Sequence, residues 1–183
     1  MARGFRVAVL GHLRDEKDPF RAADALAYLP ADAGVEVVQL GAALSPGMER
    51  EARRRMAREP RYRWLGSLPH ARALAWLSRS HLLVVSSRME GGANVISEAL
   101  IARVPVIASD ISGNIGMLGR GYRGYYPVSD ARALAKLLGK HPSCPFNPLL
   151  ANAFFRAGYI EPWGRGIEKI HRECREHGID PPV

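Results

Sequence analysis

Short apolar runs alternate with amphipathic segments over roughly the first 138 residues of the chain. The apolar runs are rich in β-branched residues and leucine, which is typical of strands that are covered on both faces. We expect strands at residues 6–10, 35–40, 62–66, 81–87, 104–109 and 124–128. Between them, helical spacing predicts helices at 18–29, with Asp18 as the cap, within 48–63, and at 68–80, 94–102 and 130–139. This alternation predicts an α/β fold with one parallel sheet flanked by helices.

The pattern changes after residue 138. Three prolines within residues 139–148 indicate a boundary, so we divide the chain into a domain at 1–138, a linker at 139–146 and a helical tail at 147–183. The tail is either a helical hairpin that covers the sheet or a segment of different origin. His171, Cys174 and His177 share one predicted helix, but three such residues without further ligands do not predict a metal site.

Composition narrows the class of protein. The chain has 183 residues, enough for one domain and a short appendage, and none of its apolar runs approaches the ~20 residues of a membrane helix. The two cysteines, Cys144 and Cys174, are too few for a disulfide framework. A reducing, cytoplasmic location fits these features best.

The net charge of +8 allows several kinds of anionic partner. Much of the basic surplus lies within 48–63, where acidic residues are interspersed at spacings that suit a solvated helix face. The sequence shows no zinc-finger spacing or aromatic ribonucleoprotein motif, so nucleic acid is an unfavoured partner.

Two loops that follow predicted strands carry candidate chemistry. They are "GHLRDEK" at 11–17 and "SSRMEGGAN" at 86–94, and in a parallel sheet both should lie on the same rim. Lys17 offers a compact cation for phosphate, and Arg14 could add a second charge.

The second loop predicts an anion site. Gly91, Gly92 and Ala93 leave the backbone bare ahead of Asn94, a good helix cap, so free N–H groups and the helix dipole would favour phosphate. Glu98 lies about one turn into the helix and should lean back toward the same ligand, where a carboxylate suits hydroxyl groups such as a ribose diol. The alternative is a simple tight turn followed by an acid that the helix dipole favours.

In this order, the motifs resemble the nucleotide-binding C-terminal domain of GT-B glycosyltransferases, particularly the large retaining family 4. The resemblance rests on two glutamates separated by seven residues, Glu90 and Glu98, on the following "VPVIAS" strand, and on the "GHLRDEK" loop. It covers roughly residues 5–138 and implies a Rossmann-like domain, half of a GT-B fold.

The resemblance also implies residue roles. Lys17 would contact the diphosphate of a nucleotide-sugar, and Glu98 would hold the ribose. Glu90 would hold the donor sugar and the backbone of residues 91–94 the distal phosphate, with the loop 66–69 beside the base. No cofactor or metal is implied, and the donor substrate is a UDP-sugar.

The sequence departs from the family pattern at three places: the acid that often follows the next glycine turn is absent from "SGNIGMLG", and two further positions differ. His12 replaces an arginine, and Arg103 replaces the glycine that usually ends the helix, where a left-handed conformation would cost on the order of 1 kcal/mol. These details look closest to the subgroup of selenosugar synthases of selenoneine biosynthesis, which join selenophosphate to a UDP-sugar.

GT-B enzymes react between two domains, and the resemblance aligns this chain with the second. Catalytic residues are therefore expected in an N-terminal acceptor domain, and the isolated chain is expected to be weakly active or inactive. A partner chain could supply that domain. Residues ~139–183 resemble instead the C-terminal part of ATP-binding proteins assigned as transcriptional regulators, although the rest of that ATP site has no match here.

Two functions follow. The first is a nucleotide-sugar-binding domain of a retaining glycosyltransferase. The second is a non-catalytic, basic α/β module that docks a partner or nucleic acid. The residues leave the base, the sugar, the acceptor and the oligomeric state open.

Overall fold

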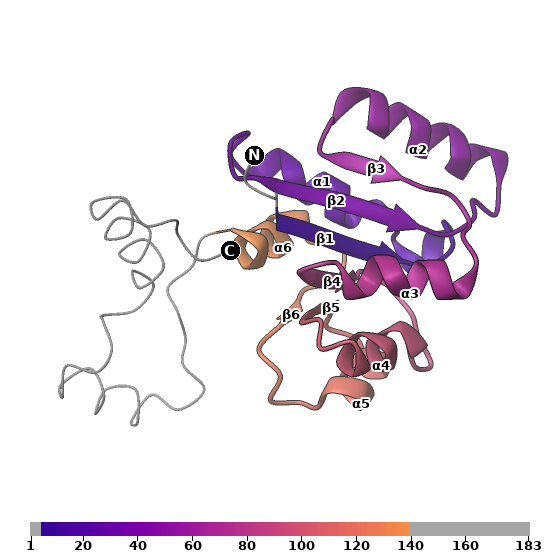
Figure 1. The fold of residues 1–183 in the computed structure, drawn as a ribbon. Coiled ribbons are helices and arrows are strands. Elements are labelled where there is room, and N and C mark those ends of the chain that lie inside the picture. The colour runs from indigo at the N-terminus through magenta and orange to yellow at the C-terminus, as the bar shows by residue number, and fades with distance from the viewer. Residues whose placement is uncertain (1–4, 140–183) are drawn as a thin grey trace, which may run out of the picture. The chain divides into compact units, whose positions relative to one another are not determined.

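The computed structural model describes residues 5–139, which form a six-stranded parallel sheet with helices on both faces (Figure 1). The strand order is β3-β2-β1-β4-β5-β6. The strands are β1 (Phe5–Leu10), β2 (Val35–Leu40), β3 (Tyr62–Trp64), β4 (Leu82–Val85), β5 (Val106–Ser109) and β6 (Tyr125–Tyr126). The predicted α/β fold class is therefore confirmed.

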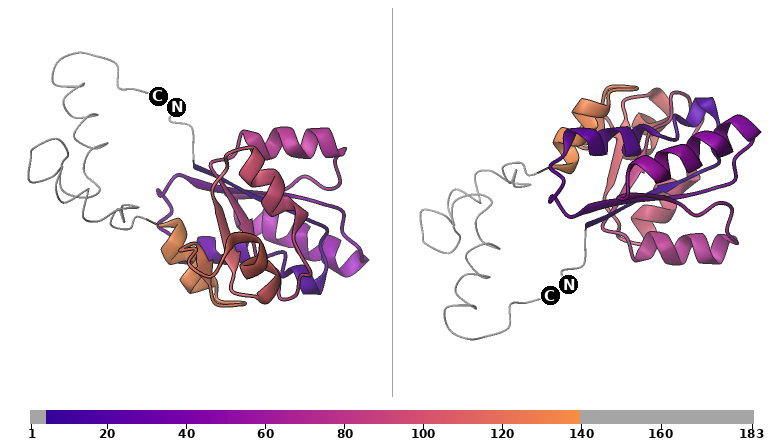
Figure 2. Two further views of the ribbon diagram at one scale, coloured as in Figure 1. Left: turned by 90° about the horizontal axis from the view of Figure 1, so that it is seen from below. Right: turned by 90° about the horizontal axis from the view of Figure 1, so that it is seen from above.

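Within residues 5–139, six α-helices and two 3-10 helices accompany the strands. They are η1 (Asp15–Lys17), α1 (Arg21–Ala25), η2 (Leu26–Tyr28), α2 (Pro46–Arg58), α3 (His70–Ser78), α4 (Asn94–Ile101), α5 (Ser112–Leu118) and α6 (Ala131–Leu138). Figure 2 shows α1, α2 and α6 over one face of the sheet and α3 over the other.

Each face of the sheet has its own apolar core, because side chains of successive strand residues point to opposite faces. In β1, Val7 and Val9 belong to the core beneath α1 and α6, whereas Ala8 belongs to the core beneath α3 and α4. All four residues of β4 are buried. This double burial explains why the central strands read as continuous apolar runs.

The chain reverses its direction of travel across the sheet beside β1. β1 pairs with β2 on one side and with β4 on the other, so the chain first builds β2 and β3 toward one edge and then β4, β5 and β6 toward the other. A parallel α/β sheet binds ligands at such a switch point, outside the carboxyl ends of the strands. The loops after β1 and β4, which carry the candidate chemistry, both leave the sheet there.

Two predicted helix caps are wrong. Asp18 does not cap α1, since it adopts a left-handed conformation after η1 and α1 begins at Arg21. Asn94 is the first helical residue of α4, and Ala93 holds the cap position without a side-chain hydrogen bond. The left-handed conformation expected for Arg103 is confirmed by its φ of 57°.

The chain divides into two units, Met1–Gly139 and Lys140–Val183. Apart from Gly139, the predicted linker and the helical tail lie outside the described residues, as do both cysteines, His171 and His177. Within residues 5–139, no helix is long and apolar enough to cross a membrane, and no group of three or more potential metal ligands occurs. The cytoplasmic location and the independence from metal stay predictions.

Candidate functional site

Lys17 and Glu90 meet at the switch point although 73 residues separate them in sequence. The Lys17 ammonium forms an ion pair with Glu90 Oε1, which also accepts a hydrogen bond of 2.8 Å from the Ser87 hydroxyl. The Glu90 side chain is only 10% exposed. The two loops predicted to share a rim therefore do so, with a cation and a carboxylate in direct contact.

The loop that carries Glu90 rests on α5. A Cβ atom at Gly113 would overlap the carbonyl oxygen of Glu90, so only glycine allows this close approach. The buried Ser109 hydroxyl donates to the carbonyl of Ser87 and links the same loop to the end of β5. Glu90 is thus held from two sides by neighbouring elements.

The start of α4 presents the predicted phosphate-binding backbone. Gly91, Gly92 and Asn94 are exposed, and Ala93 is buried. The first N–H groups of a helix have no partner within the helix, and the helix dipole gives them positive potential. This segment directly follows Glu90, so an anion held here would lie close to the Lys17–Glu90 pair.

Glu98 lies one turn into α4 and has a partner that sequence reasoning missed. Its Oε1 lies 2.9 Å from Nε2 of His70, the first residue of α3. His70 is largely exposed and follows the loop that the family resemblance places beside the base. Oε1 of Glu98 is thus paired with His70, whereas Oε2 has no partner within residues 5–139 and can accept from a ligand.

A small hollow of about 20 Å³ lies beneath Lys17 and Glu90 at the ends of β1, β2 and β4. The fully buried side chain of Gln39 lines it, and its Oε1 accepts a 2.7 Å hydrogen bond from the Tyr62 hydroxyl. Burial raises the pKa of Tyr62 well above its ordinary value, so this hydroxyl keeps its proton. Nε2 of Gln39 has no hydrogen-bond partner among the described residues.

The structure does not bring Arg14 to either glutamate of the site. Arg14 precedes η1, its side chain is half-exposed, and within residues 5–139 its ion pair is with Glu16, at 4.0 Å. His12, which stands at the family's arginine position, accepts a 3.1 Å hydrogen bond from the Ala42 backbone through Nδ1.

Ser86 and Ser87 are two further site residues that the sequence analysis did not predict. Ser86 anchors the loop after β1, since its hydroxyl lies 3.0 Å from the carbonyl oxygen of Lys17. Ser87 orients Glu90 as described above. Two adjacent small hydroxyl residues at the end of a buried strand are the signal that could have identified them.

Together, the parallel sheet with its strand-order reversal and the two converging loops define the Rossmann-like half of a GT-B fold. The profile of the family "Glycosyl transferases group 1" matches residues 3–146. The chain therefore belongs to this glycosyltransferase family. A second profile, "Putative ATP-dependent DNA helicase recG C-terminal", matches residues 130–183, most of which lie outside the described residues.

Among curated proteins, the chain is similar to "Putative teichuronic acid biosynthesis glycosyltransferase TuaC" of Bacillus subtilis. The two are 32% identical over 76 residues, which are 42% of this chain and 20% of that protein. Because the chain covers so little of this relative, the relative's activity and substrates do not transfer to it directly.

Among solved structures, HepE of Anabaena in complex with UDP and glucose is similar, with a TM-score of 0.66 and 25% identity over 75% of this chain and 38% of that chain. The catalytic domain of cholesterol-α-glucosyltransferase from Helicobacter pylori gives a TM-score of 0.59 and 14% identity, over 73% of this chain and 83% of that chain. The second likeness shows the fold alone.

Proposed function

We propose that this domain binds a nucleotide-sugar, specifically a UDP-sugar, as the donor for glycosyl transfer. The contact between Lys17 and Glu90 carries the proposal, because it joins a phosphate-type cation and a hydroxyl-type acceptor at the ligand-binding rim of the sheet. The HepE complex with UDP and glucose supports it, since that fold is shared over three quarters of this chain.

Lys17 and the start of α4 would hold the diphosphate. A diphosphate carries more negative charge than the single carboxylate of Glu90, so it would compete effectively for the Lys17 ammonium. When the bond between the sugar and the diphosphate breaks, negative charge grows on the departing phosphate. A fixed ammonium and the backbone N–H groups of residues 91–94 would stabilise that charge.

The two glutamates would hold the hydroxyl groups of the donor. Glu98, kept in place by His70, has Oε2 free to accept from a ribose diol. Glu90, once its ammonium partner turns to the diphosphate, would keep its bond to Ser87 and accept from the transferred sugar. Arg14 would serve as an outer, solvent-exposed charge.

We further propose, from the subgroup resemblance, that the acceptor is selenophosphate and the enzyme a retaining selenosugar synthase. Two features support this finer proposal, namely "GHLRDEK" with His12 and "SRMEGGANVISEAL" with Arg103 after the helix. Because the isolated chain is expected to be weakly active or inactive, the test combines it with an N-terminal acceptor domain, UDP-N-acetylglucosamine or UDP-glucose, and selenophosphate, and identifies the products by mass spectrometry. Transfer to another acceptor at a greater rate would contradict it.

Calorimetry with UDP, UDP-sugars and ADP tests donor binding. We expect UDP to bind and Lys17→Ala to lower its affinity about 10- to 100-fold, because a charge-assisted bond to the diphosphate is lost. Glu98→Ala should weaken binding less, on the order of tenfold, since it removes hydrogen bonds to the ribose.

Lys136→Ala provides the matched control, because it removes a lysine from the last turn of α6 rather than from the rim. Its UDP affinity should equal that of the wild type. A folded chain that binds no uridine nucleotide would overturn the proposed function, and equal losses in Lys17→Ala and Lys136→Ala would overturn the role of Lys17.

A further inference from the structure

Asp18, the residue after Lys17, has a backbone conformation that is unusual for a residue with a side chain. Its φ of 43° and ψ of 54° are left-handed, and the residue is only 7% exposed. Aspartate and asparagine are among the few non-glycine residues that adopt this conformation, but it still costs free energy. Contacts elsewhere must therefore hold the chain in this turn.

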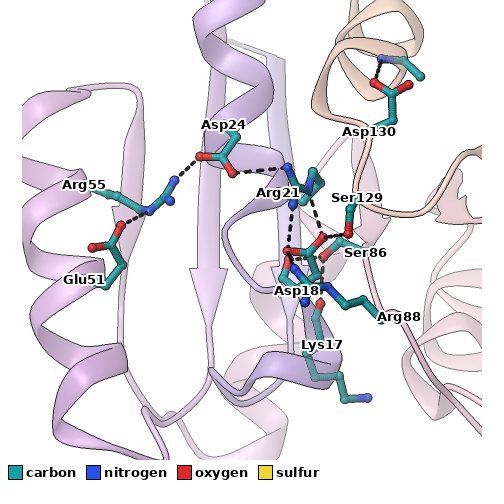
Figure 3. Close-up of polar contacts among 11 residues, drawn as sticks. Lys17, Asp18, Arg21, Asp24, Glu51, Arg55, Ser86, Arg88, Ser129 and Asp130 are labelled. Carbon is teal, nitrogen blue, oxygen red and sulfur yellow. Dashed lines mark hydrogen bonds and ion pairs between the residues drawn. The ribbon is translucent and has the colours of Figure 1, made fainter.

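The carboxylate of Asp18 contacts three separate elements (Figure 3). Arg21 of α1 donates to it twice, from Nε to Oδ2 at 2.9 Å and from Nη2 to Oδ1 at 3.2 Å. Arg88, from the loop after β4, lies 3.5 Å from Oδ1. The hydroxyl of Ser129, 111 residues away in sequence, donates to Oδ2 at 3.2 Å.

The backbone on either side of Asp18 is attached to the loop that carries Glu90. The Ser86 hydroxyl lies 3.0 Å from the carbonyl oxygen of Lys17 and 2.9 Å from that of Asp18. The N–H of Arg88 donates to the carbonyl of Glu16 at 2.8 Å. These bonds fix the turn from Glu16 to Asp18 against the end of β4.

The Lys17 side chain leaves this turn in the direction opposite to the Asp18 cluster, as Figure 3 shows. A left-handed residue directly after Lys17 sets the direction in which the chain turns away, and so sets where the lysine Cα–Cβ bond points. Lys17 itself has four rotatable side-chain bonds and would not otherwise be held in one place.

We propose that Asp18 is a positioning residue that holds Lys17 at the donor-phosphate site through its left-handed backbone and its buried carboxylate. This inference rests on the proposed function, because it assigns Lys17 a phosphate ligand. Asp18 does not touch the ligand. Its effect on donor binding must therefore pass through Lys17, and a double-mutant cycle can detect that dependence.

The experiment measures UDP affinity by calorimetry for the wild type, Asp18→Asn, Lys17→Met and the double variant. Asparagine tolerates the left-handed turn but removes the charge that Arg21 and Arg88 neutralise. We expect Asp18→Asn to lower UDP affinity on the order of tenfold, or about 1.4 kcal/mol. In the Lys17→Met background the same substitution should change the affinity less than about twofold.

Asp24→Asn is the matched control. Asp24 also pairs with Arg21, at 3.6 Å, and with Arg55, but it lies in α1 rather than in the turn. It should lower the melting temperature and leave UDP affinity unchanged. If Asp18→Asn does not fold, Ser129→Ala removes one of the Asp18 contacts more gently and enters the same cycle.

The outcomes separate the two proposals. An affinity loss from Asp18→Asn or Ser129→Ala that disappears without Lys17 supports the positioning role. A loss of equal size in both backgrounds, or no loss with Lys17 present, overturns it while the proposed function stands. Failure of the folded wild type to bind UDP overturns the proposed function, and this inference with it.

Discussion

At the scale of single residues, the rim is built from small residues that let two loops approach. Ser86 and Ser87 bond to the turn after β1 and to Glu90, and Gly113 gives the Glu90 backbone room. In the structure the two serine hydroxyls bond to protein atoms, namely the backbone carbonyls at the end of η1 and the Glu90 carboxylate, and Gly113 has no side chain to offer. Their contribution is to fix the distance between Lys17 and Glu90.

Gly113→Ala should weaken donor binding. Its methyl group would overlap the Glu90 carbonyl, so the loop must move and Glu90 must shift away from Lys17. We expect a loss of UDP-sugar affinity on the order of tenfold, together with a lower melting temperature. Gly116→Ala, in the same helix, meets no atom within 4 Å, so it should leave the affinity unchanged and raise the melting temperature slightly, because alanine restricts the unfolded chain. Equal behaviour of the two variants would contradict the steric argument.

The sequence identified Lys17, Glu90 and Glu98 because each lies in a loop or first helical turn after a strand, and in a parallel sheet the carboxyl ends of the strands share one rim. It could not predict the conformation of Asp18 or its contact with Ser129. Those depend on how segments more than 100 residues apart pack together. It predicted the wrong cap for the same reason, since Asp18 bonds to the Arg21 side chain instead of to free N–H groups.

At the scale of elements, α4 combines the proposed phosphate-binding start with a strained end. Its first residue follows the exposed glycines, and its C-terminal end closes with two hydrogen bonds, from Arg103 N–H to Leu100 at 3.1 Å and from Val104 N–H to Ala99 at 2.8 Å. This pattern is a Schellman motif, which favours glycine at the left-handed position. Arg103 occupies that position with a φ of 57°.

Arg103→Gly should therefore stabilise the protein. Glycine relieves the left-handed strain, although the greater freedom of the unfolded chain offsets part of the gain, so the free energy of unfolding should rise by about 1 kcal/mol. Urea denaturation measures it. Arg79→Gly, at the end of α3 with a φ of −96°, relieves no such strain and should not stabilise. A loss of stability in Arg103→Gly would contradict the prediction.

The turn before β3 contains an ion pair, between Glu59 and Arg61, whose contribution to stability depends on pH. The Arg61 guanidinium bonds to Glu59 and lowers the pKa of that carboxyl below its ordinary value of 4.5, against the opposing effect of partial burial. Arg61 also donates to the carbonyls of Leu26 and Pro30, and so links β3 to the end of η2.

A lowered pKa in the folded state means that Glu59 stabilises the fold above its ordinary pKa and loses this contribution as the pH falls through the folded-state value. Glu59→Gln should therefore be less stable than the wild type at pH 7, and the difference should shrink below pH 4.5. Denaturation curves across this range measure the difference. A difference independent of pH would contradict the assigned role of the carboxylate.

At the scale of the whole molecule, the basic surplus is partly offset where it is densest. In α2, Arg53 pairs with Glu49, Arg54 with Glu51, and Arg55 with both Glu51 and Asp24 of α1. Acids and arginines at these spacings pair with one another along the helix, so much of its positive charge is neutralised. This arrangement favours the proposed nucleotide-sugar site over a general polyanion surface as the place where a ligand binds.

Ligand-linked stability distinguishes these two readings for the full chain. A ligand that binds only the folded state at 100 times its Kd raises the free energy of unfolding by about 2.7 kcal/mol. We expect UDP to do so in the wild type, and Lys17→Met to need a much higher UDP concentration for the same shift.

Duplex DNA should stabilise the chain only at low salt, because salt ions compete with the protein for the DNA phosphates and the affinity falls steeply as their concentration rises. Thermal unfolding in the presence of each ligand at 50 and 200 mM salt, two concentrations over which such binding falls on the order of a thousandfold or more, gives the comparison. Stabilisation by DNA that persists at the higher salt, with none by UDP, would identify the chain as a nucleic-acid-binding module instead.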